Sequence, residues 1–141
     1  MVARFRRGRS FRVKAVDTNI LARFILADDE HQSAMASEIL GAPVWVSLTV
    51  WLELGWVLSK RAALGRAMVA DAIEALLQLG TIHTADRDGL SWAVTRYREG
   101  ADWADMIHLV SARSVADGFV TFDRGIATHA GQSPVPVETL I

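Results

Sequence analysis

The sequence contains no cysteine, which excludes disulfide bridges and cysteine-based zinc sites and is compatible with a reducing cytoplasm. It also contains no apolar run of the roughly 18 residues that a membrane-spanning helix needs. The apolar segment of a signal peptide is missing after the basic N-terminus. We therefore expect a cytoplasmic protein without a membrane segment.

Internal repeats, low-complexity segments and interdomain linkers are likewise missing. A chain of 141 residues, 51% of them apolar, can bury a hydrophobic core without covalent or metal cross-links. We therefore expect one domain over residues 13–141, preceded by a basic extension over residues 1–12.

Charge is unevenly distributed along the chain. Six basic residues and no acidic residue lie within positions 1–14, although the net charge of the whole chain is −1. Three interpretations of the extension stay open: it binds nucleic acid phosphates, it is a disordered tail, or it is upstream sequence from a misplaced start codon.

Short β-like runs alternate with amphipathic helical stretches. We expect strands at 13–16, 44–46, 81–84, 118–122 and 135–138. We expect helices at 18–26, 30–40, 66–79 and 103–116, one capped by Ser47 that runs to about residue 61, one capped by Asp86 that runs to about residue 99, and a short one directly after residue 123. This order predicts an α/β fold in which helices cover both faces of a mostly parallel sheet.

Two acidic residues lie where expected strands end. Asp17 directly follows the first strand and Asp123 directly follows the fourth. In open parallel sheets, binding sites form beyond the carboxyl ends of the strands, so both are candidate site residues. Each could equally be the N-cap of the helix that follows it, because aspartate is among the preferred capping residues.

Glu53 is the third candidate, because apolar residues surround it on its helix. Its neighbours three and four positions away include Val50, Trp56 and Val57. A carboxylate in such a stripe is costly unless it is paired or binds a cation. The alternative is a buried ion pair, or a glutamate that reaches the surface at the edge of the stripe.

Asp102, Asp105 and His108 lie near the start of the helix expected at 103–116, roughly on one side of it. Capping and the helix dipole account for Asp102, but less well for Asp105, which borders an apolar stripe. His108 could bind a transition metal, although a single histidine on a helix more often has a structural role.

Asp17, Glu53, Asp105 and Asp123 would together form a site of hard oxygen ligands, which suits Mg²⁺ or Mn²⁺ better than zinc. Such a cation suits phosphate chemistry, because it neutralises developing charge and activates water. Hydroxyl and amide side chains beside the acids could orient them; these are Thr18, Asn19 and Thr121.

In this pattern the chain resembles the PIN-domain family, specifically the VapC-type toxins of bacterial toxin–antitoxin pairs. The matching segments, in order, are residues 16–21 (VDTNIL), the helix around Glu53, residues 101–107 (ADWADMI) and residues 120–124 (VTFDR). The resemblance covers about residues 13–141. The basic extension is the main departure, because members of the family usually begin just ahead of the first strand.

The resemblance implies a three-layer α/β/α fold and a Mg²⁺- or Mn²⁺-dependent endoribonuclease that hydrolyses RNA with metal-activated water. It also implies a homodimer and a cognate DNA-binding antitoxin that blocks the site. Carried over by motif, the catalytic and metal-binding residues are Asp17, Glu53, Asp105 and Asp123, with Thr18, Asn19, Asp102 and Thr121 around them.

Two other functions stay open at this point. An aspartyl-nucleophile, phosphatase-like hydrolase would use Asp17, but such enzymes commonly have a second aspartate two residues later, where this chain has Asn19. A noncatalytic, receiver-like signalling module would leave Glu53 unexplained. Loss of nuclease activity on chelation, compared with phosphorylation of Asp17, would separate these classes.

The expected helix at 47–61 is apolar nearly all round between Leu48 and Leu58, and the chain has five tryptophans. We expect apolar surface to remain exposed there for a homodimer, an antitoxin groove or both. The alternative is that the helix at 66–79 covers this surface within the chain.

Overall fold

The computed structural model describes residues 13–141, and its strands and helices alternate as the sequence predicts. The basic extension, residues 1–12, lies outside the described residues, so its three interpretations stay open. In chain order the elements are β1 (Lys14–Ala15), α2 (Thr18–Leu26), α3 (Glu30–Leu40), β2 (Val44–Val46), α4 (Leu48–Trp56), the π-helical segment η1 (Val57–Arg61), α5 (Arg66–Leu77), β3 (Ile82–Thr84), α6 (Arg87–Arg98), α7 (Trp103–Ala112), β4 (Phe119–Thr121), α8 (Arg124–Ala130) and β5 (Val137–Thr139).

Short polar side chains fix where the helices begin. The side chains of Asp17, Ser47, Asp102 and Asp123 accept hydrogen bonds from backbone N–H groups in the first turns of α2, α4, α7 and α8. Each such cap stabilises its helix by about 1 kcal/mol. The capping role of Asp17 and Asp123 is therefore confirmed, and it uses only one carboxylate oxygen of each.

All strand pairings are parallel, which confirms the expected sheet type. β1 pairs with β2, β2 with β3, and β4 with β5. Within residues 13–141 the strands form two separate sheets, ordered β1-β2-β3 and β4-β5, instead of one continuous sheet. The α/β/α class is correct, but the sequence pattern does not reveal this division, because it encodes strands and not their long-range pairing.

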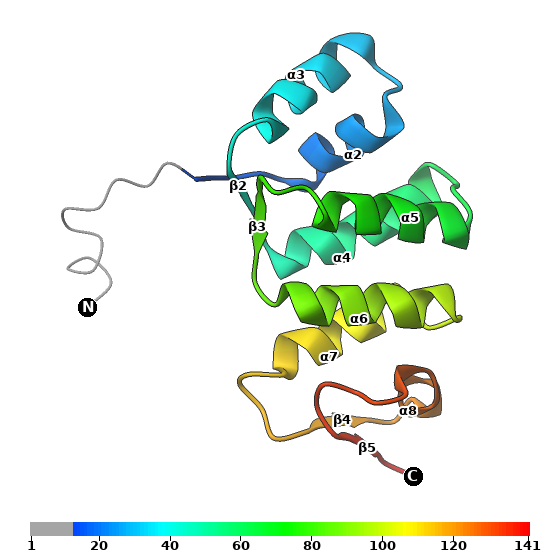
Figure 1. Cartoon of the computed structure of the whole chain (residues 1–141). Helices are drawn as coiled ribbons and strands as arrows, with labels where there is room; N and C mark the ends of the chain where they lie inside the picture. The colour runs from blue at the N-terminus through cyan, green and yellow to red at the C-terminus, as the bar shows by residue number, and fades with distance from the viewer. Residues whose placement is uncertain (1–12) are drawn as a thin grey trace, which may run out of the picture.

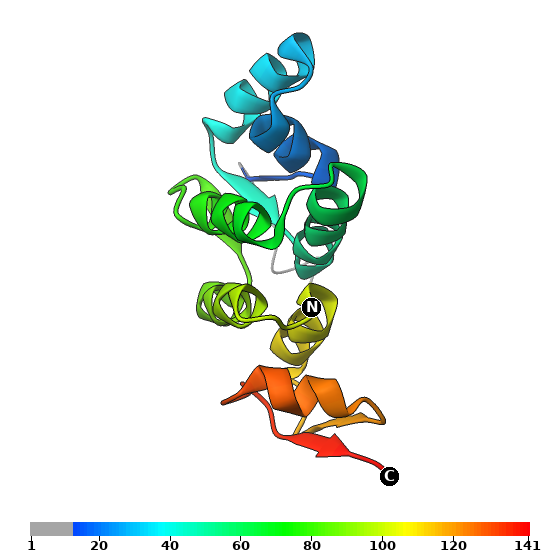
Figure 2. The same cartoon turned by 90° about the vertical axis from the view of Figure 1, so that its right-hand side faces the viewer.

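Helices surround the two sheets and lie between them. α2 packs on α3, α5 packs on α6, and α7 contacts both α4 and α6. Figure 1 and Figure 2, which differ by a quarter turn, both place β4, β5 and α8 on the far side of α6 and α7 from the sheet that contains β1. The β4-β5 sheet is therefore attached to the rest of the molecule through α6 and α7.

An interlock of two buried tryptophans joins α4 to α7. Trp51 is fully buried, Trp103 is 5% exposed, and the indole N–H of Trp103 donates to the backbone oxygen of Trp51 at 2.8 Å. Gly55 makes this approach possible, because a Cβ atom there would lie 2.2 Å from Cδ1 of Trp103. The indole N–H of Trp51 donates to the hydroxyl of Thr84 at 2.9 Å, which ties α4 to the end of β3. These contacts fix the position of α7 against α4.

Some apolar surface remains exposed near α4. The helix packs against α2 and α7, whereas α5 packs mainly against α6, so residues 66–79 cover little of α4. Trp56 is 54% exposed and Trp45 is 39% exposed. An exposed apolar region beside α4 thus agrees with the sequence, and its use in a homodimer or antitoxin groove stays a prediction. No helix within residues 13–141 is both long and apolar enough to cross a membrane.

Candidate active site

Asp17 and Glu53 lie close together at the carboxyl end of β1. Asp17 caps α2, and the hydroxyl of the next residue, Thr18, donates a short hydrogen bond to a carboxylate oxygen of Glu53 on α4. Thr18 is buried, at 5% exposure, so it anchors the Glu53 side chain from inside the molecule. Asp17, Thr18, Asn19 and Glu53 line one hollow of about 150 Å³.

A basic residue, Arg61, lines the same hollow, although the sequence pattern does not single it out. It lies eight positions after Glu53, so a regular α-helix would place it about 80° around the helix axis from Glu53. The π-helical segment Val57–Arg61 accommodates extra chain in one turn and so brings Arg61 back toward that side. Its guanidinium adds a positive charge to a hollow otherwise dominated by carboxylates.

Asp102, Asp105 and Asp123 form a second group. Asp102 caps α7 by accepting from the backbone N–H of Asp105 at 3.0 Å, and Asp105 lies in the first turn of that helix. Asp123 follows β4 and caps α8 by accepting from the N–H of Gly125 at 2.8 Å. The hydroxyl of Thr121 accepts from the N–H of Asp123 at 2.9 Å. Both aspartates at the helix starts are therefore held in defined turns.

The pKa of the Asp105 carboxyl depends on burial and on the charged groups around it. Burial raises the pKa of Asp105 above its ordinary value, the negative charges of Asp102 and Asp123 raise it further, and His108 opposes the shift. These groups therefore share one electrostatic environment. A bound cation would lower the cost of keeping Asp105 ionised there. His108 itself is exposed on α7.

The predicted acids do not converge into one cluster within the chain. In the part of the chain that the structure describes, no group of three or more acidic or histidine side chains is arranged to hold a metal ion. Asp17 and Glu53 form one half of the predicted set, whereas Asp105 and Asp123 belong to the other. Their oxygen atoms are chemically suited to a hard divalent cation, but each half is only part of the set.

Glu53 lies in a different environment from the one expected. Its side chain is exposed, so the prediction of a carboxylate embedded in apolar surroundings is wrong. Val50 and Val57 are half-buried, but Trp56 faces solvent, and the stripe therefore has an open edge at Glu53. The alternative of a glutamate that reaches the surface at the edge of the stripe is correct.

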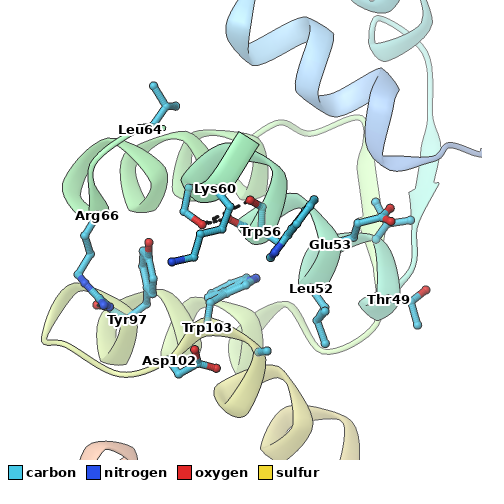
Figure 3. A pocket seen from close by; sticks show the side chains of 14 residues that line it. Thr49, Leu52, Glu53, Trp56, Lys60, Leu64, Arg66, Tyr97, Asp102 and Trp103 are labelled. Atoms are coloured by element: carbon cyan, nitrogen blue, oxygen red, sulfur yellow. Dashed lines mark hydrogen bonds between the residues drawn. The ribbon is translucent and has the colours of Figure 1, made fainter. Parts of the chain in front are cut away.

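A cleft of about 860 Å³ opens between α4 and α7 (Figure 3). Glu53 and Asp102 both line it, so the cleft runs from Glu53 on α4 to the start of α7. Trp56 and Trp103 contribute aromatic rings, and the side chain of Lys60 extends into it. Aromatic rings beside a cation are suited to the unstacked bases and phosphates of single-stranded nucleic acid.

Arg66 holds one wall of this cleft in place. Its guanidinium donates to the backbone oxygens of Tyr97 and Ala101 at 2.8 and 2.7 Å and lies 4.4 Å from the centre of the Tyr97 ring. The Tyr97 ring meets Trp103 edge-on, with the ring centres 5.9 Å apart. Arg66 thus orders the segment that leads into Asp102. This role could not be predicted from the sequence, because the contacts join residues more than thirty positions apart.

Comparison with known proteins identifies the family. The family model described as PIN domain matches residues 14–132, which is well over half of the chain. No curated protein and no solved structure matched. The matched range contains every predicted site residue, from Asp17 to Asp123. The motif resemblance is therefore confirmed at the level of the family, and the chain belongs to the PIN-domain family, whose members are generally nucleases.

Proposed function

We propose that this protein is a metal-dependent endoribonuclease that acts as the toxin of a toxin–antitoxin pair. Membership of the PIN-domain family is the observation that carries the nuclease part of the proposal. Asp17 and Asp123 support it, because each lies directly beyond the carboxyl end of a parallel strand, where sites form in α/β proteins.

The proposed metal-binding residues are Asp17, Glu53, Asp105 and Asp123, whose carboxylates are the ligand type that Mg²⁺ and Mn²⁺ prefer. A bound cation of this kind supplies an acidified water and neutralises charge on the scissile phosphodiester. The chain itself orients the donors. Thr18 holds Glu53 by its hydroxyl, and the cap hydrogen bonds hold one oxygen of Asp17 and of Asp123.

Three further polar residues are proposed to position this site. Asn19 lines the hollow beside Asp17. Asp102 fixes the first turn of α7, and Thr121 fixes the turn after β4. Such neighbours restrict the orientation of the metal-binding groups. We therefore expect removal of any one of them to lower metal affinity or activity by roughly 10–100-fold, the loss that is typical of metal sites.

RNA is the proposed substrate, and the cleft beside Glu53 is its proposed binding groove. Single-stranded RNA presents unstacked bases that bind aromatic faces, and Trp56 is exposed at the cleft. Lys60 extends into the same space and is placed to contact a phosphate. The groove would hold the strand next to the carboxylates without reading a fixed sequence.

The toxin role follows from the sequence motifs that resemble VapC-type proteins. A DNA-binding antitoxin would cover the exposed apolar region around Trp56 and could bring a basic side chain to the carboxylates. Induction of the gene should then arrest growth, and co-expression of a short neighbouring gene for a DNA-binding protein should restore it. Growth that is unaffected by induction would contradict the toxin role while leaving the nuclease proposal intact.

The test of the enzyme activity uses the purified full chain and end-labelled single-stranded RNA, with DNA of the same sequence in parallel. We expect RNA cleavage with Mg²⁺ or Mn²⁺ and none in EDTA. Asp17→Asn and Asp105→Asn should each lower the rate by at least the roughly 10–100-fold that loss of a supporting neighbour costs a metal site, whereas Asp117→Asn, at an exposed aspartate outside both groups, should not. Full activity of Asp105→Asn in EDTA would overturn the metal-dependent mechanism.

A further inference from the structure

The π-helical segment after α4 ends in two consecutive basic residues, Lys60 and Arg61, which line different openings. Lys60 lines the cleft between α4 and α7 (Figure 3), whereas Arg61 lines the hollow of about 150 Å³ that contains Asp17 and Glu53. Consecutive residues of a helix do not face each other, so the two side chains leave the segment in different directions. Glu53 lines both openings, and the cleft and the hollow therefore both border this residue.

A second hollow continues the space beyond the carboxylates. It has a volume of about 230 Å³, lies between α2 and the π-helical segment, and shares Asn19, Val57 and Arg61 with the hollow of Asp17 and Glu53. The cleft, the first hollow and the second hollow thus form a series in which each opening shares at least one residue with the next. A nucleic acid strand that enters along the cleft has a surface on which to continue past Glu53.

The guanidinium of Arg61 is exposed, and within residues 13–141 it forms neither an ion pair nor a hydrogen bond. Most other arginines of that part of the chain do form such contacts; these are Arg23, Arg66, Arg87, Arg96, Arg98 and Arg113. Arg23 also lines the second hollow, but it is already paired with Asp28 at 2.9 Å. Arg61 is therefore the cation of the two hollows whose charge is available to a ligand.

The backbone that carries Arg61 is held in place, although the side chain is exposed. Leu58, in the same segment, is fully buried. The N–H of Ala62 donates to the backbone oxygen of Val57 at 2.9 Å, which is the five-residue spacing of a π-helix. Single π-helical turns of this kind occur frequently at functional sites. The turn thus presents Arg61 from a fixed position beside the carboxylates.

An anion with several oxygen atoms is the ligand that suits this position. A guanidinium donates two parallel hydrogen bonds to phosphate oxygens, which an ammonium group does not do. The carboxylates of the first hollow repel a phosphate unless a divalent cation lies between them. Because Arg61 also lines the second hollow, which extends away from Glu53, it is placed to bind a phosphate next to the one held at the carboxylates.

We propose that Arg61 binds the RNA backbone at a phosphate that flanks the scissile one, on the α2 side of Glu53, while Lys60 binds the strand on the cleft side. The strand then crosses the carboxylates instead of ending at them. An endonuclease needs such a path, because the substrate continues on both sides of the cut. This inference rests on the proposed nuclease function and adds a substrate-binding residue to its site.

Binding of the full-length protein to fluorescently labelled single-stranded RNA in EDTA tests the contact without cleavage. We expect Arg61→Gln to weaken binding by roughly 3–10-fold and to reduce the slope of log affinity against log salt concentration by about 0.7, the value for one phosphate of a single strand. Arg61→Lys should retain the slope, because it retains the charge. Arg98→Gln is the matched control, since it removes the same charge from α6, where Arg98 pairs with Asp71 and Glu74. Its slope and affinity should stay native.

Uncharged linkages locate the phosphate that Arg61 contacts. The cleavage position of the native protein is first mapped on an end-labelled RNA. Methylphosphonates in 2′-O-methyl nucleotides then replace single phosphates on either side of it, with 2′-O-methyl phosphodiesters as the reference. At one flanking linkage, the methylphosphonate should raise the KM of the native protein but not that of Arg61→Gln, because the contact is already lost. Lys60→Gln should show the same coupling at a linkage on the other side of the cut.

Three results would overturn the proposal. The first is an Arg61→Gln variant with native affinity and salt slope. The second is coupling of Arg61 and Lys60 to linkages on the same side of the cut. The third is a fall in kcat at unchanged KM for Arg61→Gln, which would place the guanidinium on the scissile phosphate itself. Thermal unfolding of each variant checks that the fold is intact.

These readouts distinguish failure of the inference from failure of the proposed function. An active native protein whose Arg61→Gln variant keeps its KM and salt slope would leave the nuclease function standing without this contact. A native protein that cleaves no RNA with either cation would overturn the proposed function, and the salt slope in EDTA would still decide whether Arg61 contacts a phosphate.

Discussion

Gly55→Ala tests the interlock that positions α7 and hence Asp105. Gly55 lies in α4, and its missing side chain gives space to the ring of Trp103. An added Cβ would lie 2.2 Å from Cδ1, 2.6 Å from Nε1 and 2.9 Å from Cγ of that ring. Ordinary contact begins at 3.4 Å, so the ring or the helix must move by more than an ångström. A 5% exposed ring has little room for such a movement.

Two opposing effects decide the sign of the change in stability. Alanine is favoured over glycine inside a helix by about 1 kcal/mol. Overpacking of a filled core costs about 1–3 kcal/mol, and loss of the Trp103 hydrogen bond to Trp51 adds about 1 kcal/mol. We therefore expect Gly55→Ala to lower the free energy of unfolding by about 1–3 kcal/mol, which corresponds to a fall in Tm of roughly 4–10 °C for a chain of this size.

Thermal unfolding by circular dichroism in EDTA measures this effect without a contribution from metal. Gly80→Ala is the matched control, because an added Cβ there meets nothing within 4 Å, and its Tm should stay equal or rise slightly. In the background of Trp103→Ala, which removes the obstructing ring, Gly55→Ala should no longer destabilise. A native or higher Tm for Gly55→Ala alone would refute the proposed interlock.

Three further predictions concern charge, wall contacts and RNA. Burial raises the pKa of Asp105, and the negative charges of Asp102 and Asp123 raise it further. The folded chain therefore holds the proton of the Asp105 carboxyl more tightly than the unfolded chain does, and the free energy of unfolding falls as pH rises from about 4. Asp105→Asn should therefore raise the Tm at pH 7 in EDTA, and the gain should shrink below about pH 4; no gain at pH 7 would contradict this origin. Arg66→Lys keeps the positive charge but removes the guanidinium that donates to two backbone oxygens. Urea unfolding should therefore show that the free energy of unfolding falls by about 1 kcal/mol. Trp56→Ala should weaken metal-free RNA binding by about 5–150-fold in fluorescence anisotropy, whereas Trp56→Phe should retain most of it, and equal affinities would exclude stacking at this position.

Local features of the fold can be predicted from short stretches of sequence. Asp17 and Asp123 mark the starts of α2 and α8, because a capping side chain acts within three residues of itself. Helix periodicity locates the apolar stripe of α4, and Ser47 marks where that helix begins. The same two capping residues mark where β1 and β4 end, so two of the candidate site residues can also be located from the sequence.

Features that depend on tertiary contacts could not be predicted in the same way. The exposure of Glu53 depends on what covers α4, and its neighbours within the helix do not determine that. Arg61 lines the Glu53 hollow at the end of a π-helical segment, which shifts the helical phase. The separation of β4 from β1 depends on how Trp103 and Arg96 hold α7 and α8. The exposure of Glu53 and the separation of β4 from β1 depend on residues far apart in the sequence, and the position of Arg61 depends on a local change of helix type that the apolar pattern does not encode.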